Sequence, residues 1–123
     1  MSNAAANAYA KVATTTATPR EIEAQALLKA ANQLQDVLVN QDPTGERTQA
    51  ALMFNRKLWS IFVSDALRDE NQQPLDVRQK IANIGIFVLS QTAALQHLQR
   101  SDDLQSLIDI NRNLAAGLSG RAA

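Results

Sequence analysis

The sequence predicts an all-α protein, a single-domain antiparallel bundle of four main helices. Apolar residues recur at steps of three and four over long segments, which is the spacing of one helical face. No segment of useful length alternates apolar and polar residues as a half-buried strand does. The connections between the helical segments are short and polar, and short loops make neighbouring helices antiparallel. At 123 residues the chain fits one domain with one core, over residues 1–123.

The first main helix is expected over about 19–39. Thr18 is suited to cap it, Pro19 suits its first helical position, and a glutamate follows three residues after the cap. Ahead of this helix, residues 4–13 are rich in alanine and predict a short helix that is marginal unless it docks. Residues 1–18 are therefore expected to form a loosely docked arm.

The second main helix, over about 44–68, contains the single tryptophan of the chain. Asp42 and Thr44 are alternative caps for its first turn. Trp59 and Phe62 both lie on its main apolar stripe, so core packing is favoured over an interface for them.

A third helix is expected over about 75–99 and a fourth over about 102–117. Pro74 precedes the third, because proline suits a first turn better than a helix interior. Leu114 lies on the apolar face of the fourth helix and is expected in the core. The main stripe of the third helix consists of Val77, Ile81, Ile84, Val88 and Leu95.

Two asparagines, Asn55 and Asn111, interrupt apolar stripes and carry more information than any charged residue. A buried asparagine without partners costs about 1–3 kcal/mol, so a stripe that contains one should supply hydrogen bonds in return. The two side chains are candidates to meet across the core. A structural role in fixing helix register is favoured over direct ligand recognition.

Four large apolar residues lie toward the flanks of the best stripes, where a four-helix core leaves room for exposure: Met53, Phe54, Ile86 and Phe87. They are the sequence candidates for an exposed partner-binding groove. Burial in the core is the alternative for each of them, and the favoured one for Phe87.

Composition and motifs exclude most chemistry. Twelve basic residues balance twelve acidic ones, so no basic stripe for a nucleic acid is expected. There is no cysteine, and His97 is the single histidine, so neither a metal nor another cofactor is expected. No nucleophile elbow, P-loop, dinucleotide fingerprint or HExxH motif occurs, so no catalytic residue is assigned and an enzyme is not expected. With no secretory signal and no apolar run of about 20 residues, a soluble cytoplasmic protein is expected.

Four short motifs, taken in order, resemble the FlaF family of flagellar biosynthesis regulators from alphaproteobacteria. The resemblance covers nearly the whole length, and each motif alone is a short helical pattern of low specificity. The motifs are Ala8-Tyr9, TPREIEA from Thr18 to Ala24, NRKLW from Asn55 to Trp59, and IDINRNL from Ile108 to Leu114 followed by Gly117-Leu118.

The resemblance implies a cytoplasmic, non-enzymatic factor that is needed for flagellin production and export and acts with the translational regulator FlbT. Members of the family look like flagellin secretion chaperones. Two alternatives stay open: a regulator that contacts flagellin mRNA directly, and a scaffolding bundle in the export system. An arm bearing Tyr9 could cover the partner-binding groove as a displaceable lid, so Tyr9 joins the candidate contact residues.

Overall fold

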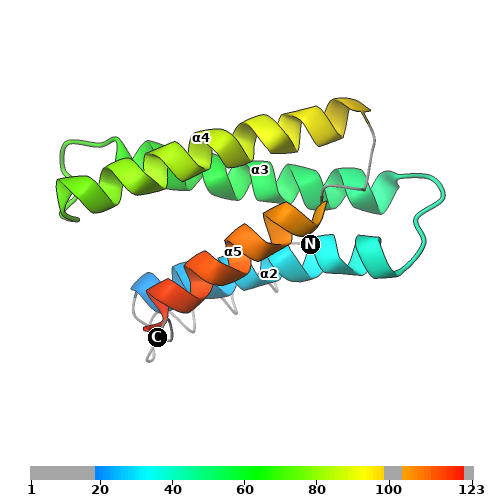
Figure 1. Ribbon diagram of the computed structural model, residues 1–123, viewed down its shortest axis with the longest axis horizontal. Helices are drawn as coiled ribbons and strands as arrows, with labels where there is room; N and C mark the ends of the chain where they lie inside the picture. The colour runs from blue at the N-terminus through cyan, green and yellow to red at the C-terminus, as the bar shows by residue number, and fades with distance from the viewer. Residues whose placement is uncertain (1–18, 99–103, 121–123) are drawn as a thin grey trace, which may run out of the picture.

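The computed structural model describes residues 19–98 and 104–120, and these form four helices (Figure 1). They are α2 (Pro19–Val39), α3 (Glu46–Ala66), α4 (Leu75–Leu98) and α5 (Leu104–Leu118). The predicted all-α antiparallel bundle is confirmed. The two helices that begin with or directly after a proline start where the sequence predicts. The predicted helix over residues 4–13 lies outside the described residues.

The four helices are arranged as two closely packed pairs. α2 packs along α5, and α3 packs along α4, whereas α2 and α3 contact each other less extensively. α4 and α5 barely touch. Figure 1 shows the two pairs close together near the start of α5 and farther apart at the opposite end, where the loop between α3 and α4 lies. The bundle is therefore open along one side at that end.

The N-cap of α3 is Gly45, and the two predicted caps, Asp42 and Thr44, accept hydrogen bonds from first-turn amides without occupying the cap position. Asp42 accepts hydrogen bonds from the Thr48 amide at 2.7 Å and from the Thr48 hydroxyl at 2.6 Å. Thr44 accepts a hydrogen bond from the Glu46 amide at 3.3 Å through its hydroxyl oxygen. Gly45, between Thr44 and Glu46, has a φ of 78°, a left-handed conformation that glycine adopts without steric cost. The helix therefore begins at Glu46, two residues later than predicted.

The connection between α3 and α4 is held by Asn71, which bonds to Asp65, Arg68 and Gln73, and by Arg78. The Arg78 guanidinium donates to the carbonyl oxygen of Ala66 at 2.9 Å and to that of Arg68 at 2.8 Å. Ala66 is the last residue of α3, where helical backbone acceptors lack partners within the helix, and Arg68 lies in the loop just after it. A side chain near the start of α4 thus bonds to the end of α3 and to the loop that follows it.

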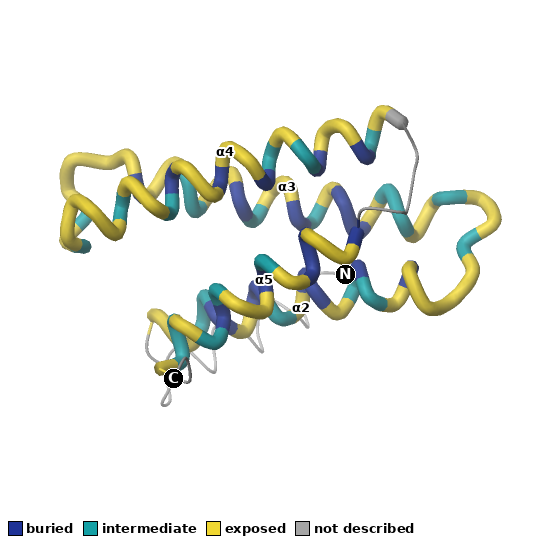
Figure 2. Tube along the Cα trace, in the orientation of Figure 1, coloured by how far each residue is buried: buried dark blue, intermediate teal, exposed yellow. Residues whose placement is uncertain are grey.

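The core lies between the pairs, and buried positions face the interior in Figure 2. Alanines at the α2 surface let the α5 backbone approach closely, which explains why this pair packs so extensively. The principal buried apolar residues are Ala24, Leu27, Ala31, Leu34, Leu52, Trp59, Val88, Leu95, Leu104, Leu107, Ile108 and Ala115.

The predicted stripe of α4 is buried only in its second half. Val88 and Leu95 are buried, as predicted, but Val77 is 36% exposed and Ile84 is 40% exposed. The predicted stripe is therefore only partly covered, because α4 and α5 make few contacts and no helix of the described chain covers its first half.

Candidate partner-binding groove

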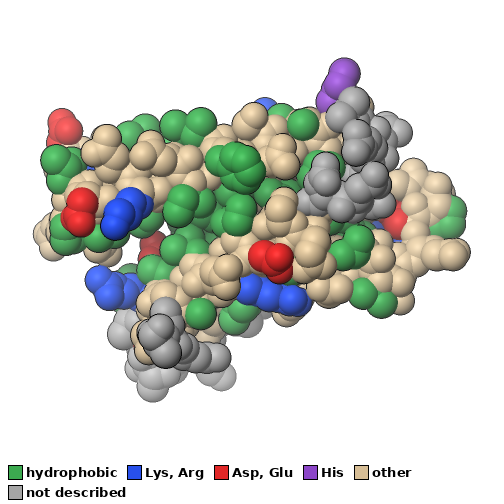
Figure 3. Space-filling view, viewed as in Figure 1, with side chains coloured by type: hydrophobic (Ala, Val, Ile, Leu, Met, Phe, Trp, Pro, Cys, Tyr) green, Lys and Arg blue, Asp and Glu red, His purple; other side chains and the backbone are tan. Residues whose placement is uncertain are grey.

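A groove of about 330 Å³ lies at the open end of the bundle, where all four helices contribute walls. We call it the end groove. Figure 3 shows hydrophobic side chains following the hollow between the two helical pairs, with charged groups at its rim. The apolar side chains that line the end groove are Phe62, Pro74, Val77, Ile81, Leu114 and Leu118.

The antiparallel topology brings these apolar residues together. Val77 and Ile81 belong to the first turns of α4, and Leu114 and Leu118 belong to the last turns of α5. Because the two helices run in opposite directions, the beginning of one stripe lies beside the end of the other. The helices do not close on each other there, so both stripe ends face the same hollow.

Four charged side chains also line the end groove: Arg20, Glu23, Asp65 and Arg78. Asp65 accepts a hydrogen bond from the Asn71 side-chain amide at 3.2 Å and lies 3.7 Å from the Arg68 guanidinium. Arg78 is engaged by the carbonyls at the end of α3. Asp65 and Arg78 are thus held by contacts with their neighbours, whereas the structure shows no such contact for the Glu23 carboxylate among the described residues.

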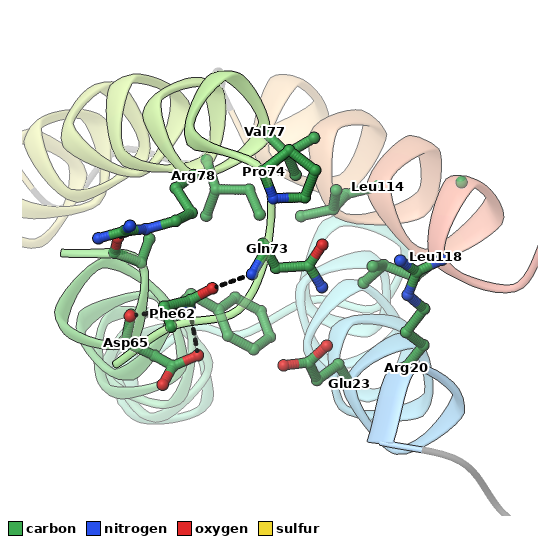
Figure 4. A pocket seen from close by; sticks show the side chains of 14 residues that line it. Arg20, Glu23, Phe62, Asp65, Gln73, Pro74, Val77, Arg78, Leu114 and Leu118 are labelled. Atoms are coloured by element: carbon green, nitrogen blue, oxygen red, sulfur yellow. Dashed lines mark hydrogen bonds between the residues drawn. The ribbon is translucent and has the colours of Figure 1, made fainter. Parts of the chain in front are cut away.

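Glu23 is half-buried in the end groove. Burial raises the pKa of its carboxyl group above the ordinary 4.5, the nearby Asp65 carboxylate raises it further, and Arg20 acts in the opposite direction. Figure 4 shows Glu23 and Asp65 on either side of the Phe62 ring, with Arg20 farther along α2. The ionised form of Glu23 is therefore less favourable in the folded protein than in the unfolded chain.

A polar network lies in the core deeper inside the bundle. Asn111 donates to the side-chain oxygen of Asn55 at 2.8 Å and accepts from the indole N–H of Trp59 at 2.9 Å. Asn55 donates in turn to the Thr92 hydroxyl at 3.3 Å, and that hydroxyl donates to the Val88 carbonyl at 2.6 Å. In the described part of the chain no buried side-chain nitrogen or oxygen lacks a partner. The two asparagines therefore do meet, and they connect α3 with α5 and α4.

The residues predicted to be structural divide into two groups. Asn55, Trp59 and Asn111 are fully buried. Phe62 and Leu114 pack against the core but are only partly buried, since both lie where the bundle opens and line the end groove. Phe62 meets Trp59 edge to face, with ring centroids 5.5 Å apart and an interplanar angle of 84°.

The residues predicted to contact a partner are not brought into one groove. Met53 on α3 is exposed, as are Ile86 and Phe87 on α4. Phe54 is partly buried on the side of α3 that faces α2, where the Lys29 ammonium lies 5.3 Å from its ring centroid. None of these four residues lines the end groove. Tyr9 lies outside the described residues.

Sequence reasoning did not identify the end groove. It placed Val77 and Ile81 on the main apolar stripe of the third helix, and it named neither Glu23 nor Leu118 as a partner-binding residue. A usable signal was present in the predicted topology, since Pro19 and Pro74 open two helices whose starts lie at the same end of the bundle. Glu23, an acidic residue directly before the apolar stripe of α2, was the second signal.

Across residues 19–98 and 104–120 there is no group of three or more His, Cys, Asp or Glu side chains that could hold a metal ion. None of the helices in the described part is long and apolar enough to cross a bilayer.

Comparison with known proteins gives one result that bears on identity. The family model described as flagellar protein FlaF matches residues 5–118. The match includes all four described helices. Searches of curated proteins and of solved structures returned no match.

Proposed function

The chain belongs to the FlaF family of flagellar proteins and so has a role in flagellum biosynthesis, and from this premise we propose that it is a flagellin-binding secretion chaperone. In this proposal it is a non-enzymatic cytoplasmic factor that works with the translational regulator FlbT. The observation that supports the chaperone role is the end groove, an apolar hollow that no helix of the described chain fills.

The end groove suits an amphipathic helix. Flagellin monomers carry amphipathic terminal helices that are disordered before assembly, and such segments fold as they bind. A helix that lays its apolar face into a hydrophobic groove is a recurrent mode of peptide recognition. The groove supplies apolar walls from α4 and α5, and Phe62 lies at its base.

The exposed half of the α4 stripe adds to this surface. Val77 and Ile84 stand in line with residues that are buried farther along the same helix. Full burial of a Val, Ile or Leu side chain is worth roughly 1.5–3 kcal/mol. A bound helix that covers the open side would therefore gain energy from residues that the protein itself leaves in water.

Met53, Phe54, Ile86 and Phe87 form a second hypothesis for the contact surface, independent of the end groove. Of these, Phe87 on α4 serves as the test residue, because it is a large aromatic side chain that is 51% exposed. The two hypotheses predict opposite outcomes when a charge is placed on one surface or the other.

The test is calorimetric titration of the purified protein with flagellin and, separately, with FlbT. Val77→Asp and Leu118→Asp place a charge in the end groove and should weaken flagellin binding by about 10- to 100-fold, because burying an unpaired charge costs several kcal/mol. Phe87→Asp is the matched variant outside the groove and should leave affinity within about twofold. Circular dichroism melting of each variant shows that the fold is retained.

Each outcome of the titration decides between hypotheses. Absence of heat with flagellin refutes the chaperone proposal, and absence of heat with FlbT refutes that partnership. If Phe87→Asp abolishes flagellin binding while Val77→Asp does not, the contact surface is the one that contains Phe87 and not the end groove. An RNA shift with the purified protein that weakens with salt would instead support direct contact with flagellin mRNA.

A further inference from the structure

Glu23 has an unusual environment for a carboxylate in an apolar groove. It projects from α2 beside Phe62, and the Asp65 carboxylate faces it from α3 (Figure 4). No hydrogen bond or ion pair to its carboxylate is present among the described residues. A half-buried carboxylate beside a like charge is unfavourable, which accounts for the raised pKa of this group.

The neighbouring cations do not neutralise Glu23. Arg78 is held by two backbone carbonyls at the end of α3. The Arg68 guanidinium lies 3.7 Å from the Asp65 carboxylate and 3.8 Å from the Glu70 carboxylate, so it pairs with these two acids and not with Glu23. Arg20 lowers the pKa of Glu23 through space, but this is the smallest of the three influences on it. Glu23 thus has no directly bonded cation among the described residues, and Arg20 is the one nearby positive charge that acts on it.

We propose that the end groove selects a flagellin helix that carries a lysine or arginine at the edge of its apolar face, and that Glu23, with Asp65, receives this cation. The inference rests on the proposed chaperone function and adds the chemistry of the ligand. The apolar walls bind the hydrophobic stripe of the helix, and the two carboxylates orient it by its basic residue.

The same charge acts against wrong partners. An apolar helix without a basic residue would bury the Glu23 carboxylate with no partner, and an acidic helix would add a third negative charge. Specificity of this kind comes from a penalty on the wrong ligand as well as from attraction to the right one. In this proposal the unfavourable ionisation of Glu23 in the free protein is offset when the cation of the bound helix pairs with its carboxylate.

A competing occupant is the segment that precedes α2. Residues 1–18 join α2 at Pro19, which lies next to Arg20 and Glu23, and their single basic residue is Lys11. If this segment occupies the groove, Lys11 supplies the cation. The experiment must therefore separate flagellin from this part of the same chain.

The test compares Glu23→Gln with the parent protein in calorimetric titrations with flagellin. Glu23→Gln should weaken binding by about tenfold, since a hydrogen bond to a charged group contributes about 1.5–3 kcal/mol. Affinity of the parent should fall as salt is raised, and affinity of the variant should depend on salt much less. Asp69→Asn, an exposed acid in the loop after α3, is the matched control and should change neither value.

A second arm identifies the cation. Each Lys and Arg of the flagellin terminal helices is changed to Glu in turn. One of the altered flagellins should bind the parent protein more weakly than unaltered flagellin does. The same altered flagellin should bind a Glu23→Lys variant better than it binds the parent. This rescue by exchanged charges is not expected if Glu23 has only a structural role.

The outcomes distinguish failure of the inference from failure of the proposed function. If the parent binds flagellin and Glu23→Gln binds equally well, the inference is overturned and the chaperone role stands. If the parent does not bind flagellin, both are overturned. If Lys11→Gln removes the effect of Glu23→Gln on the melting temperature of the free protein, residues 1–18 are the occupant and the inference is again overturned.

Discussion

Substitution of the two core asparagines by leucine should destabilise the protein to different extents, and the hydrogen bonds give the ranking. Asn55→Leu leaves one buried group, the Asn111 side-chain N–H₂, without its acceptor. Thr92 keeps its own bond to the Val88 carbonyl, so it is not orphaned. A buried unsatisfied group costs about 1–3 kcal/mol, and this is the expected loss in free energy of unfolding.

Asn111→Leu leaves two buried groups without partners, the Trp59 indole N–H and the Asn55 side-chain oxygen. The expected loss is therefore about 2–6 kcal/mol, roughly twice that of Asn55→Leu. Since both variants carry the same new side chain, the difference between them reports mainly on the orphaned polar atoms. A loss at the upper end would be a large part of the roughly 5–15 kcal/mol by which domains are stable.

The assay is urea unfolding followed both by far-ultraviolet circular dichroism and by the fluorescence of Trp59, the single tryptophan and a fully buried one. Asn55→Leu should keep its helical signal but lose dispersion in its amide NMR spectrum, because the polar pairing that specifies helix register is gone. Asn113→Leu, at an exposed position of α5, is the control and should stay within about 0.5 kcal/mol of the parent.

Two results would refute the reasoning. The first is a parental unfolding midpoint together with a well-dispersed spectrum for Asn55→Leu, which would show that the network does not specify register. The second is a larger loss for Asn55→Leu than for Asn111→Leu, which would mean that unsatisfied hydrogen bonds do not dominate the energetics.

Three further predictions concern single residues. Glu23→Gln should raise the melting temperature at pH 7: the pKa of Glu23 is raised in the folded state, so stability falls as pH rises above about 4.5, and the gain should vanish below that pH. Asp42→Ala should lower the melting temperature at pH 7: hydrogen bonds from Thr48 lower the pKa of Asp42, so its contribution exists above pH 3.8 and is lost as pH falls below that value. Gly85→Ala should lower the free energy of unfolding, measured in urea, by about 1–3 kcal/mol, because the new methyl group would lie 2.2 Å from a methyl carbon of Val63. At Gly117 a new methyl group meets no atom within 4 Å, so Gly117→Ala should be neutral or stabilising.

Each of these predictions has a clear contrary result. A pH-independent difference between Glu23→Gln and the parent would show that ionisation of this residue does not matter to stability. The gap in melting temperature between Asp42→Ala and the parent should narrow as pH falls below 3.8, and a gap that does not change with pH would point to a role other than ionised capping. Equal stability of the two glycine variants would mean that α3 and α4 can separate at Gly85 without cost.

The arrangement of helices was predictable because it follows from local patterns. Pro19 and Pro74 mark helix starts, and Asp42 with Thr44 marks a third, since proline and short oxygen-bearing side chains satisfy the particular needs of a first turn. The encounter of Asn55 with Asn111 followed from the cost of leaving such groups unpaired in an apolar stripe.

The candidate site was not predictable in the same way. Periodicity shows that Val77 and Ile84 share a face with Val88, but it does not show whether another helix covers that face along its whole length. Coverage depends on how the α2–α5 pair packs against the α3–α4 pair, and that arrangement rests on contacts between residues far apart in the sequence, such as the bond between Asn111 and Asn55. Phe54 was assigned to an exposed edge for the same reason, because its contact with Lys29 on α2 is a product of packing.

The pairing of α2 with α5 has a consequence for the order in which the protein can fold during synthesis. α2 leaves the ribosome first of the four helices, but its most extensive partner is α5, the last of them. α3 and α4 are neighbours in sequence and can pair early, since contacts between nearby segments form fastest. Until α5 emerges, Trp59 and Asn55 have no Asn111 to bond with, and α2 has little to cover its alanine face. Folding is therefore expected to finish only after translation has passed α5, and a nascent chain stalled before that point should be a ready target for proteases and general chaperones.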